Sequence, residues 1–344
     1  MNRIRVGIAG CGNIGGFHAK VLRDVEGAVL WAAADANFPA AQKLAGEYGC
    51  AAYSSLGDLL DKGEIDLVSV CLPPALHYEA AIAAADRGIH VLMEKPMDVS
   101  GLRAARVIEH CKNRGVKLGV VSQHRFDPVI QTLKGLIDRN RLGKRLMGTA
   151  KVLWYRGPEY YQDSGTWRGQ KSNQAGALMN QSIHYIDLLQ HLMGGVDAVQ
   201  SVCRTLLHNI EVEDTGLALL RFKNGAIGSI EAATIAYPGL MAELNIYTEK
   251  ATVSVRDDRL AFYFAKDGSI PELDALLADK SGQAAVTDPL ALDTQGHVSQ
   301  YLDMIGAINN NREPLVTGEE GRLPLVLIET IYAASEKENW TPLV

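Results

Sequence analysis

Short apolar runs and helical stretches alternate through the first third of the chain. The apolar runs lie at residues 6–9, 29–34, 67–72, 91–93 and 118–121, and the clearest helical patterns at 75–87 and 101–114. Short continuous apolar runs are typical of parallel strands that are buried on both faces. Because strands and helices alternate, the pattern predicts an N-terminal Rossmann domain, a doubly wound parallel sheet, over residues 1–123.

A different pattern begins after about residue 145, once a helix predicted at 127–140 has ended. Strand-like segments follow at 151–156, 198–206, 215–221, 226–233, 242–247, 251–255 and 259–264, and one clear helical stretch lies among them at 176–193. Few helices separate these strands, so we expect a second α/β domain over residues 124–344 with a large, open, mostly antiparallel sheet. Residues 267–296 are rich in loop signals. Two helices, at 297–310 and 319–338, close the chain, the C-terminal one able to pack back on the first domain.

Composition and charge restrict the class of protein. The 344 residues are 47% hydrophobic and 22% charged, with a formal net charge of −6. Nucleic-acid binding needs a basic face, and the chain has no Lys/Arg-rich run, so we expect no nucleic-acid partner. No run of 18 or more apolar residues occurs, so we expect no membrane span.

The cysteines and histidines give no sign of a metal or a disulfide framework. There are five cysteines, an odd number without a CxxC pair, which indicates a reducing compartment; we therefore expect a cytoplasmic protein. The nine histidines form no HExxH motif and no Cys/His ligand spacing, so no metal is expected.

The segment Gly-Cys-Gly-Asn-Ile-Gly at residues 10–15 follows the first predicted strand and opens a helix. In this context a GxGxxG pattern predicts a dinucleotide site. Gly10 permits the tight turn, Gly12 the approach of a pyrophosphate, and Gly15 the close packing of helix on strand. Asn13 and Ile14 then begin the helix, whose unpaired N–H groups bind an anion. The alternative is a plain tight turn between a strand and a helix.

Two later positions extend the predicted cofactor site. Asp35 ends the second predicted strand, where a carboxylate accepts hydrogen bonds from the adenosine ribose and repels a 2′-phosphate. No arginine follows at 36–38, so NAD(H) is favoured over NADP(H). Glu94-Lys95-Pro96 follows the strand at 91–93, at the sheet edge where ligands of such folds bind. The alternative for Glu94 and Lys95 is a solvated pair of charges in a loop.

These motifs resemble those of the Gfo/Idh/MocA oxidoreductase family. The glycine motif, Asp35, Pro73-Pro74 with His77, Glu94-Lys95-Pro96 and the run from Gly176 to Asp187 carry the resemblance, which covers nearly the whole chain. It implies that Lys95 is the catalytic lysine beside the nicotinamide and that His184 acts with it. It also implies cofactor contacts from Leu72, Pro73, His77, Glu94 and Lys95. The family further implies that the second sheets of two subunits pair face to face, giving a homodimer or homotetramer.

The helix predicted at 176–193 has a narrow polar seam. At 100° per residue, Asn180, His184, Asp187 and His191 lie within about 60° of one another, and apolar side chains fill most of the remaining circumference. Such a helix is buried, and its polar side chains need partners. His184 is then either a catalytic residue or a core histidine bonded to Asp187. We expect Asp187 to orient an imidazole or a nearby loop, and His191 to be structural.

Asn180 departs from the family pattern. Many sugar and inositol dehydrogenases of the family have Asp at this position, four residues before the histidine. An amide does not accept a proton as a base does, so Asn180 is predicted to hydrogen-bond a substrate hydroxyl, and proton transfer is left to Lys95 and His184.

Aromatic and basic residues gather at 151–171. This segment holds Trp154, Tyr155, Tyr160, Tyr161 and Trp167, together with Arg156 and Arg168. Aromatic faces suit sugar C–H surfaces, and arginine binds a carboxylate or phosphate with two parallel hydrogen bonds. We predict substrate contacts from Arg168 and Tyr155, and from Gln123 at the end of the sixth strand. The alternative for the segment is a subunit contact.

Within the family, residues 160–189 resemble the UDP-N-acetylglucosaminuronate 3-dehydrogenases and also many uncharacterised sugar dehydrogenases. The chain is therefore predicted to be an NAD(H)-dependent dehydrogenase or reductase that acts on a ring carbon of a small carbohydrate: a nucleotide sugar, a free sugar or a cyclitol such as inositol. An NAD-dependent glycosidase and a non-enzymatic NAD-binding regulator stay open on the same fold. The presence of Lys95 and His184 favours an enzyme over a regulator, since a regulator needs neither.

Overall fold

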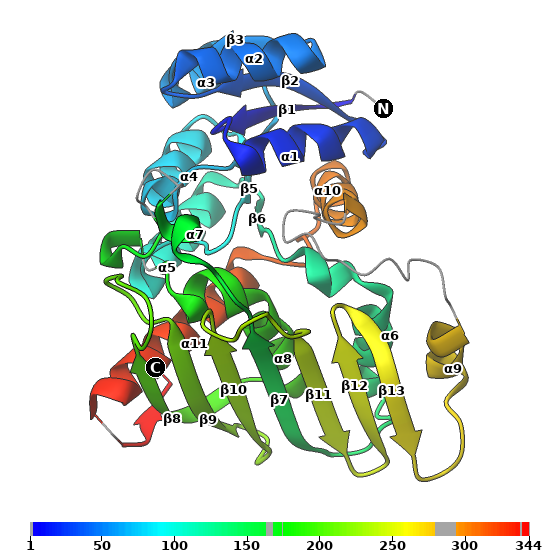
Figure 1. Cartoon of the computed structure of the whole chain (residues 1–344). Coiled ribbons are helices and arrows are strands. Elements are labelled where there is room, and N and C mark those ends of the chain that lie inside the picture. The colour runs from blue at the N-terminus through cyan, green and yellow to red at the C-terminus, as the bar shows by residue number, and fades with distance from the viewer. Residues whose placement is uncertain (1–2, 163–167, 174, 279–293, 338, 344) are drawn as a thin grey trace. The chain divides into compact units, whose positions relative to one another are not determined.

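The computed structural model describes residues 3–162, 168–173, 175–278, 294–337 and 339–343. The chain forms two compact units. The first contains Met1–Gln123 and Asp293–Arg322, and the second contains His124–Leu292 and Leu323–Val344. In Figure 1 the first unit comprises the blue and cyan segments and the orange helix α10, and the second unit carries the green and yellow strands.

A six-stranded parallel sheet forms the centre of the first unit. Its spatial order is β3 (Ala51–Tyr53), β2 (Ala28–Ala34), β1 (Ile4–Ala9), β4 (Leu67–Val70), β5 (His90–Met93) and β6 (Leu118–Val120). Val6, Ile8, Leu67 and Val68 have no exposed surface, as expected for strands covered on both faces. The predicted Rossmann sheet is confirmed, and its order reverses between β1 and β4. Ligands of such sheets bind beyond the carboxyl ends of the strands at this point.

Helices from two parts of the chain cover this sheet. The connecting helices are α1 (Asn13–Val21), α2 (Phe38–Tyr48), α3 (Leu56–Lys62), α4 (His77–Asp86) and α5 (Gly101–Arg114), with the 3-10 turns η1 (Leu22–Asp24) and η2 (Pro74–Leu76). Helix α10 (Thr294–Asn309) comes from much later in the chain. Its residues Val298, Tyr301, Met304 and Ile305 join a buried cluster with Ile8 of β1. The observed division therefore differs from the expected continuous domain at 124–344, because the apolar face of α10 completes the core of the first unit.

The second unit contains an eight-stranded sheet. Its order is β13 (Arg259–Ala265), β12 (Ala251–Arg256), β11 (Glu243–Thr248), β7 (Arg145–Leu153), β10 (Ile227–Ala233), β9 (Thr215–Phe222), β8 (Val196–Arg204) and β14 (Thr341–Pro342). Among the described strands of this sheet, β7 and β10 form the single parallel pair, and all other neighbours are antiparallel. The predicted large, mostly antiparallel sheet is confirmed.

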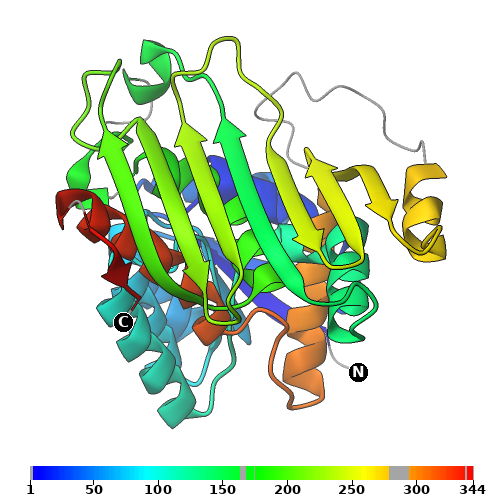
Figure 2. The same cartoon turned by 90° about the horizontal axis from the view of Figure 1, so that it is seen from below.

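One face of this sheet is covered by the π-helix η5 (Ala177–Ser182) and helix α8 (Ile183–Met193). The approach is close at Gly148 of β7, where a Cβ atom would lie 2.6 Å from Cγ of Met193. Strand β9 alternates accordingly: Ala218 and Leu220 are buried, whereas Leu217 and Leu219 are about half exposed. Figure 2 looks onto the opposite face, which no described helix of this unit covers.

The remaining helices complete the second unit. They are η3 (Gln123–Phe126), which begins at the last residue of the first unit, α6 (Pro128–Asp138), α7 (Pro158–Gln162), η4 (Lys171–Asn173), α9 (Pro271–Ala278) and α11 (Gly318–Lys337), whose first turn belongs to the first unit. In the described part of the chain, none of the helices has the length and apolar character needed to cross a membrane.

The helix predicted at 176–193 is not uniform. Its first part is the π-helix η5, and regular α-helix begins only at Ile183. A π-helix has i→i+5 hydrogen bonds, so successive residues are separated by less than 100°. The seam calculated for a regular helix is therefore wrong around Asn180, although it holds from His184 onward.

Candidate active site

The glycine loop of the first unit has the geometry of a nucleotide-binding turn. Gly10 has φ +96°, and a Cβ atom there would lie 2.5 Å from the carbonyl oxygen of Cys71. At Gly15 a Cβ atom would lie 1.9 Å from the carbonyl oxygen of Gly10, so the helix packs on the turn only with glycine here. A Cβ atom at Gly12 would meet nothing within 4 Å. The loop is thus closed on its inner side and open at Gly12, the position predicted to face a pyrophosphate.

Asp35 ties this loop to the end of β2. Its Oδ2 accepts a hydrogen bond from the amide of Cys11 at 2.7 Å, and its Oδ1 accepts from the amide of Asn37 at 2.8 Å. Helix α1 begins at Asn13, and Gly12 before it offers no side chain as a cap. The first N–H groups of a helix have no partner within it. The loop therefore presents N–H donors for an anion together with a carboxylate that has further lone pairs for hydroxyl groups, and these residues fit an NAD molecule.

A buried polar network lies behind the second predicted motif. Oε1 of Glu94 is 3.0 Å from Nε2 of His18, and Nδ1 of His18 is 2.8 Å from the hydroxyl of Tyr301 and 3.0 Å from that of Ser69. Burial acts to raise the pKa of Glu94, but the hydrogen bond and charge of His18, with the charges of Lys95 and His297, outweigh it and bring the pKa down to about 2. Glu94 is therefore a buried carboxylate at neutral pH.

This network fixes the main chain at Lys95. The amide of Lys95 donates to Oε2 of Glu94 at 2.9 Å. The carbonyl oxygen of the following residue, Pro96, is 3.0 Å from Nδ1 of His77. The peptide bond between Lys95 and Pro96 is cis. Hydrogen bonds on both sides of Lys95 thus set its backbone without using its side chain, which is half-buried.

Both ring nitrogens of His77 face backbone oxygens. Its Nε2 is 2.8 Å from the carbonyl oxygen of Leu72, and its Nδ1 is 3.0 Å from that of Pro96. Burial lowers the pKa of His77 below its usual value, so the ring is neutral and donates to one of these carbonyls at a time. With both ring nitrogens facing backbone oxygens, His77 braces the Leu72 and Pro96 segments and is not placed to hydrogen-bond a cofactor directly. Pro73, by contrast, is exposed beside Leu72.

Gln123 lies at the end of the first unit. Its side chain is 8% exposed, and its Oε1 has no hydrogen-bond partner among the described residues. A buried amide oxygen without a partner is a place where a ligand hydroxyl or a water completes the hydrogen bonding. The structure thus leaves the predicted role of Gln123 as a substrate contact chemically possible.

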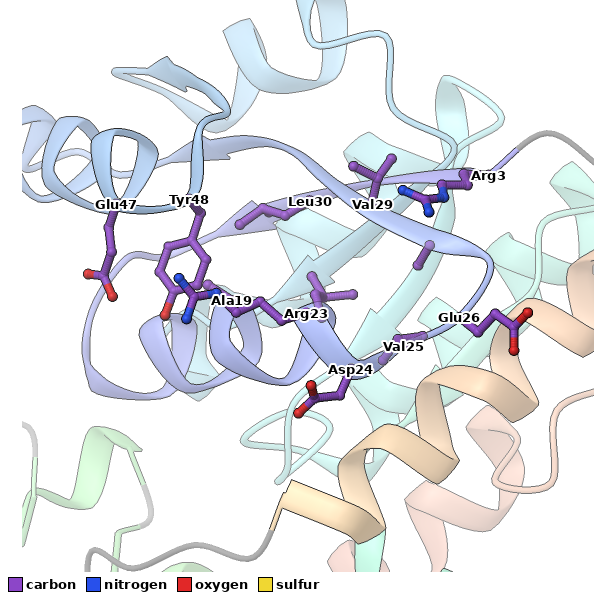
Figure 3. Close-up of a pocket in the computed structure, with 12 residues that line it drawn as sticks. Arg3, Ala19, Arg23, Asp24, Val25, Glu26, Val29, Leu30, Glu47 and Tyr48 are labelled. Atoms are coloured by element: carbon purple, nitrogen blue, oxygen red, sulfur yellow. The ribbon is translucent and has the colours of Figure 1, made fainter.

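The first unit also has a surface pocket of about 450 Å³, which Figure 3 shows. It lies near the amino ends of β1 and β2, where Arg3 and Val29 face it, and Arg23 stacks 4.8 Å from the ring centre of Tyr48. Acidic and basic side chains both line it. Because the glycine loop and Lys95 follow the carboxyl ends of the strands, this pocket is not the candidate site.

In the second unit, Tyr160 of α7 organises the polar residues around η5. Its hydroxyl accepts hydrogen bonds from Nδ2 of Asn180 at 3.1 Å and from Nε2 of Gln181 at 2.6 Å. Oε1 of Gln181 in turn accepts from Nη2 of Arg156 at 2.9 Å. The guanidinium groups of Arg156 and Arg168 lie 5.2 Å and 4.3 Å from the ring centre of Tyr160.

Only some of the predicted substrate-binding residues belong to the cluster around Tyr160. Asn180 and Arg168 both contact Tyr160, whereas Tyr155 packs edge-on against Tyr237, with ring centres 5.2 Å apart. Trp167 lies outside the described residues. Burial lowers the pKa of Arg156, but a guanidinium remains charged at neutral pH. Two cations on one tyrosine ring, next to amide groups, can bind an anionic polar ligand.

His184, the second predicted catalytic residue, has a histidine neighbour that sequence reasoning missed. The rings of His184 and His124 meet edge to face, with centres 5.1 Å apart. Nδ1 of His124 is 2.9 Å from Oδ2 of Asp127 and 3.3 Å from Oδ1 of Asp258, to which the hydroxyl of Tyr185 also donates at 3.0 Å. The one available signal was position: His124 follows Gln123 directly after the sixth strand.

Asp187 forms a buried ion pair. Its two oxygens accept from Nε and Nη2 of Arg125 at 2.8 Å and 2.5 Å, and both side chains are almost fully buried. Arg125 follows His124, so Asp187 fixes the segment that carries His124. This matches the loop-orienting role expected for Asp187.

Two groups of described side chains have donor atoms close enough for a metal ion: His18, Glu94 and His297 in the first unit, and His124, Asp127 and Asp258 in the second. Each group contains internal hydrogen bonds that account for its geometry without an ion. The absence of a metal remains a prediction.

Comparison with known proteins identifies the relatives of this chain. The family model described as "Oxidoreductase family, NAD-binding Rossmann fold" matches residues 4–122, and the C-terminal domain model of the same family matches residues 130–254. A solved structure of the WlbA dehydrogenase from Bordetella pertussis, in complex with NADH and UDP-GlcNAcA, is 34% identical. That likeness covers 100% of this chain and 98% of the other, with a TM-score of 0.92. The chain belongs to the Gfo/Idh/MocA oxidoreductase family.

Two further relatives in this family are enzymes with different substrates. Myo-inositol 2-dehydrogenase from Thermotoga maritima is 26% identical over 94% of each chain. UDP-N-acetylglucosamine 3-dehydrogenase from Acidithiobacillus ferrooxidans is 25% identical over 98% of each chain. The chain is therefore an NAD(H)-dependent oxidoreductase that acts on CH–OH groups of carbohydrates, as the sequence predicted.

Proposed function

We propose that the protein transfers a hydride between NAD(H) and a ring carbon of a nucleotide sugar that carries a carboxylate, with UDP-N-acetylglucosaminuronate as the model substrate and its C3 as the reacting carbon. The observation that carries this proposal is the cluster around Tyr160. There, two guanidinium groups lie near the ring of Tyr160, and two amide side chains donate hydrogen bonds to its hydroxyl. The 34% identical WlbA dehydrogenase, whose structure holds NADH and UDP-GlcNAcA, supports it.

The charge of the cluster favours an anion over a neutral sugar. A carboxylate or a diphosphate gains charge-assisted hydrogen bonds from Arg156 and Arg168, whereas a neutral sugar or inositol offers them only hydroxyl groups. The ring of Tyr160 supplies a flat apolar surface of the kind that sugar C–H groups pack against. Asn180, an amide beside that ring, then hydrogen-bonds a ring hydroxyl.

In the oxidative direction, the reacting C–H bond breaks as a hydride and the hydroxyl O–H bond breaks as a proton. When bound, NAD accepts the hydride with its electron pair, and the chain's residues must accept the proton. We assign this proton to Nζ of Lys95. An ammonium with a reference pKa of about 10.4 is a poor base at neutral pH, so the amine must be kept neutral in the loaded site.

His184 is assigned the orientation of the reacting hydroxyl, and His124 the orientation of His184. The edge-on contact of the two rings and the carboxylates at Nδ1 of His124 support this order. A histidine with a carboxylate on one nitrogen has a defined tautomer and ring orientation.

A second candidate substrate is a cyclitol or free sugar. The 26% identity to myo-inositol 2-dehydrogenase over nearly the whole chain favours it. The two candidates differ in what they require: inositol oxidation uses Lys95 and His184 but gives no role to Arg156 and Arg168.

The deciding experiment measures reduced-nicotinamide absorbance with NAD or NADP and with UDP-N-acetylglucosaminuronate, myo-inositol, glucose or glucuronate. We expect turnover of the nucleotide sugar with NAD, and a KM that rises at least tenfold in Arg156→Met. Lys151→Met, which removes a half-exposed charge from the nearby strand β7, is the matched control and should change KM less than twofold. Turnover of inositol, with Arg156→Met unaffected, would replace the nucleotide sugar by the cyclitol.

We also propose that the protein is a homodimer or homotetramer formed through the uncovered face of the eight-stranded sheet (Figure 2). Leu217, Leu219 and Ile227 are 49%, 53% and 58% exposed on neighbouring strands β9 and β10, and an apolar surface of this kind favours a partner. Light scattering should show that Leu219→Asp shifts the protein to monomer. Leu102→Asp, at a similarly exposed leucine of α5, should not. If both variants stay oligomeric, the interface lies elsewhere.

The proposed site of action is the cytoplasm. All five cysteines are free thiols, which supports a reducing compartment. Fractionation of cells that produce the protein tests this assignment.

A further inference from the structure

A buried carboxylate that the proposed mechanism does not use holds the start of the helix that carries Asn180 and His184. Glu213, just before β9, is 8% exposed. Its Oε1 accepts hydrogen bonds from the amide of Leu178 at 2.8 Å and from the hydroxyl of Tyr332 at 3.0 Å. Its backbone carbonyl accepts from the amide of Ala177 at 3.0 Å. The first two N–H groups of η5 therefore both donate hydrogen bonds to Glu213.

Gly176 shows how closely the carboxylate packs against this turn. A Cβ atom at Gly176 would lie 2.1 Å from Oε2 of Glu213, so no side chain fits between them. The carbonyl of Gly176 in turn accepts from the amide of Asn180 at 3.0 Å. The turn from Gly176 to Asn180 is thus built directly on the carboxylate of Glu213, and a shift of that carboxylate displaces Asn180 first and His184 one turn later.

We propose that Glu213 is a positioning residue for Asn180 and His184: it caps the start of their helix from within the core, and its ionisation loosens that start. The hydrogen bonds of Glu213 to described residues reach the main chain of η5 and the hydroxyl of Tyr332. Glu213 acts through the main chain of η5, so its effect is on where Asn180 and His184 are held and not on their chemistry.

Several titratable groups lie around Glu213 in the described part of the chain. Burial is the main cause that raises the pKa of Glu213 to about 7; the charge of Asp214 adds to it, and the hydrogen bonds from Leu178 and Tyr332 oppose it. Asp214 is buried too, but amides of residues 206–208 donate to it and hold its pKa below the usual value, so it stays negative. Burial raises the pKa of Tyr332 on α11 well above its usual value and that of Cys203 on β8 to about 12, so both are neutral.

The sign of the pH effect follows from these pKa values. When the helix start opens and exposes the carboxyl group, Glu213 ionises near its usual value of 4.5; in the closed form it ionises near 7. The closed form therefore binds the proton more tightly. Its advantage is complete below the lower value and is lost as pH rises toward the higher one. The helix start is held most firmly on the acid side of neutrality.

Hydrogen exchange of single amides measures this directly, without substrate or cofactor. We expect the protection of the Leu178 amide, corrected for the intrinsic exchange rate, to fall with a slope of up to about tenfold per pH unit between pH 5.5 and 7. In Glu213→Gln, which keeps an acceptor oxygen but does not ionise, protection should be independent of pH. Glu211→Gln, at an exposed carboxylate in the same segment, should behave like the unchanged protein.

The amide of Gly194 provides the internal control. It donates to Gln190 at the far end of α8 and has no acidic cap, so its protection should not follow the titration. Equal changes at Leu178 and Gly194 would mean that Glu213 affects only the stability of the whole unit. An unchanged slope in Glu213→Gln would assign the titration to another group. Either result overturns the proposal.

The catalytic consequence rests on the proposed function. The ratio of the KM for UDP-N-acetylglucosaminuronate in the unchanged protein to that in Glu213→Gln should rise as pH passes from 6 to 8, while the Kd for NADH stays the same in both. If the exchange result holds but the nucleotide sugar is not turned over, the proposed function fails and the positioning role stands. If turnover occurs with a constant KM ratio, the helix start does not control substrate binding.

Discussion

The candidate site residues of the two units are held in place by different means. In the first unit, Lys95 is fixed through its main chain, because its amide bonds Glu94 and the neighbouring carbonyl faces His77. In the second unit the side chains hold one another: Asn180 and Gln181 both donate to the hydroxyl of Tyr160. A side chain fixed through its backbone can be removed without disturbing its surroundings, whereas a side chain in a shared network cannot.

The buried charges follow the same division. Glu94 in the first unit bonds the ring of His18 through one oxygen and the main-chain amide of Lys95 through the other. In the second unit, the buried pair of Arg125 and Asp187 lies directly beneath the segment that carries His124. We therefore expect variants of the first unit to separate chemistry from structure, and variants of the second to change both.

The largest effect is expected for Lys95→Ala. Loss of a positioned acid–base group lowers turnover by roughly 10³-fold. NADH binding should stay within about twofold, because the bonds of Lys95 to Glu94 use the main chain. Stopped-flow turnover and NADH fluorescence titration measure the two quantities. Lys112→Ala, at an exposed lysine of α5, is the control. A normal rate in Lys95→Ala would remove this residue from the mechanism. A loss of NADH affinity would show that the side chain of Lys95 also supports the cofactor site.

Next in size is Asp187→Asn in the second unit. This change removes the negative charge from a buried ion pair while Arg125 stays charged, and breaking such a pair costs about 3–5 kcal/mol of unfolding free energy. Asp197→Asn is the matched control, since its pair with Arg221 is half exposed and contributes about 0–1 kcal/mol. Urea unfolding, monitored by hydrogen exchange of amides in each unit, measures the loss of unfolding free energy in each variant. Similar losses in both variants would show that the buried pair is not what stabilises the His124 segment.

The same division decides what the sequence could predict. The glycine motif, Asp35 and Glu94-Lys95 follow the carboxyl ends of β1, β2 and β5, and these ends lie at the same edge of a parallel sheet, so the sequence alone already predicted their place. The alternation of strands and helices likewise predicted the first sheet, apart from short elements such as β3, and the run of strands with few helices predicted the second. The role of His77 was not predictable, because it depends on two backbone carbonyls that meet only after folding.

In the second unit, contacts between distant segments decide the site. Tyr160, Asn180 and His124 belong to α7, η5 and η3, and no periodicity relates them. The π-helix at Asn180 has a smaller angle between successive residues than the 100° of a regular α-helix, so the predicted position of Asn180 around the helix was wrong. Glu213 gave no local signal at all, since its partner amide at Leu178 lies 35 residues earlier in the chain.

A smaller effect is expected for Tyr160→Phe. Without the hydroxyl, the amides of Asn180 and Gln181 lose their shared acceptor, and an unmet hydrogen bond of this kind costs about 1–3 kcal/mol. We expect the KM for the nucleotide sugar to rise about tenfold with the Kd for NADH unchanged. Tyr161→Phe is the control, because that hydroxyl bonds Thr234 and not the amides. If both variants raise KM equally, the shared network is not what orders the substrate half.

The smallest effect is expected at Asp35, whose side chain has two tasks: it supports the loop through the amides of Cys11 and Asn37, and it is expected to bind the ribose. Asp35→Asn removes the charge that repels a 2′-phosphate but keeps one acceptor oxygen. The ratio of kcat/KM for NADP to that for NAD should therefore rise about fivefold, the effect of roughly 1 kcal/mol. Asp58→Asn, at an exposed carboxylate of the same unit, should leave the ratio unchanged. A rise in the ratio without loss of stability would show that Asp35 acts mainly on the ligand. Loss of stability without a rise would show that it belongs, like Glu94, to the main-chain support of the cofactor half.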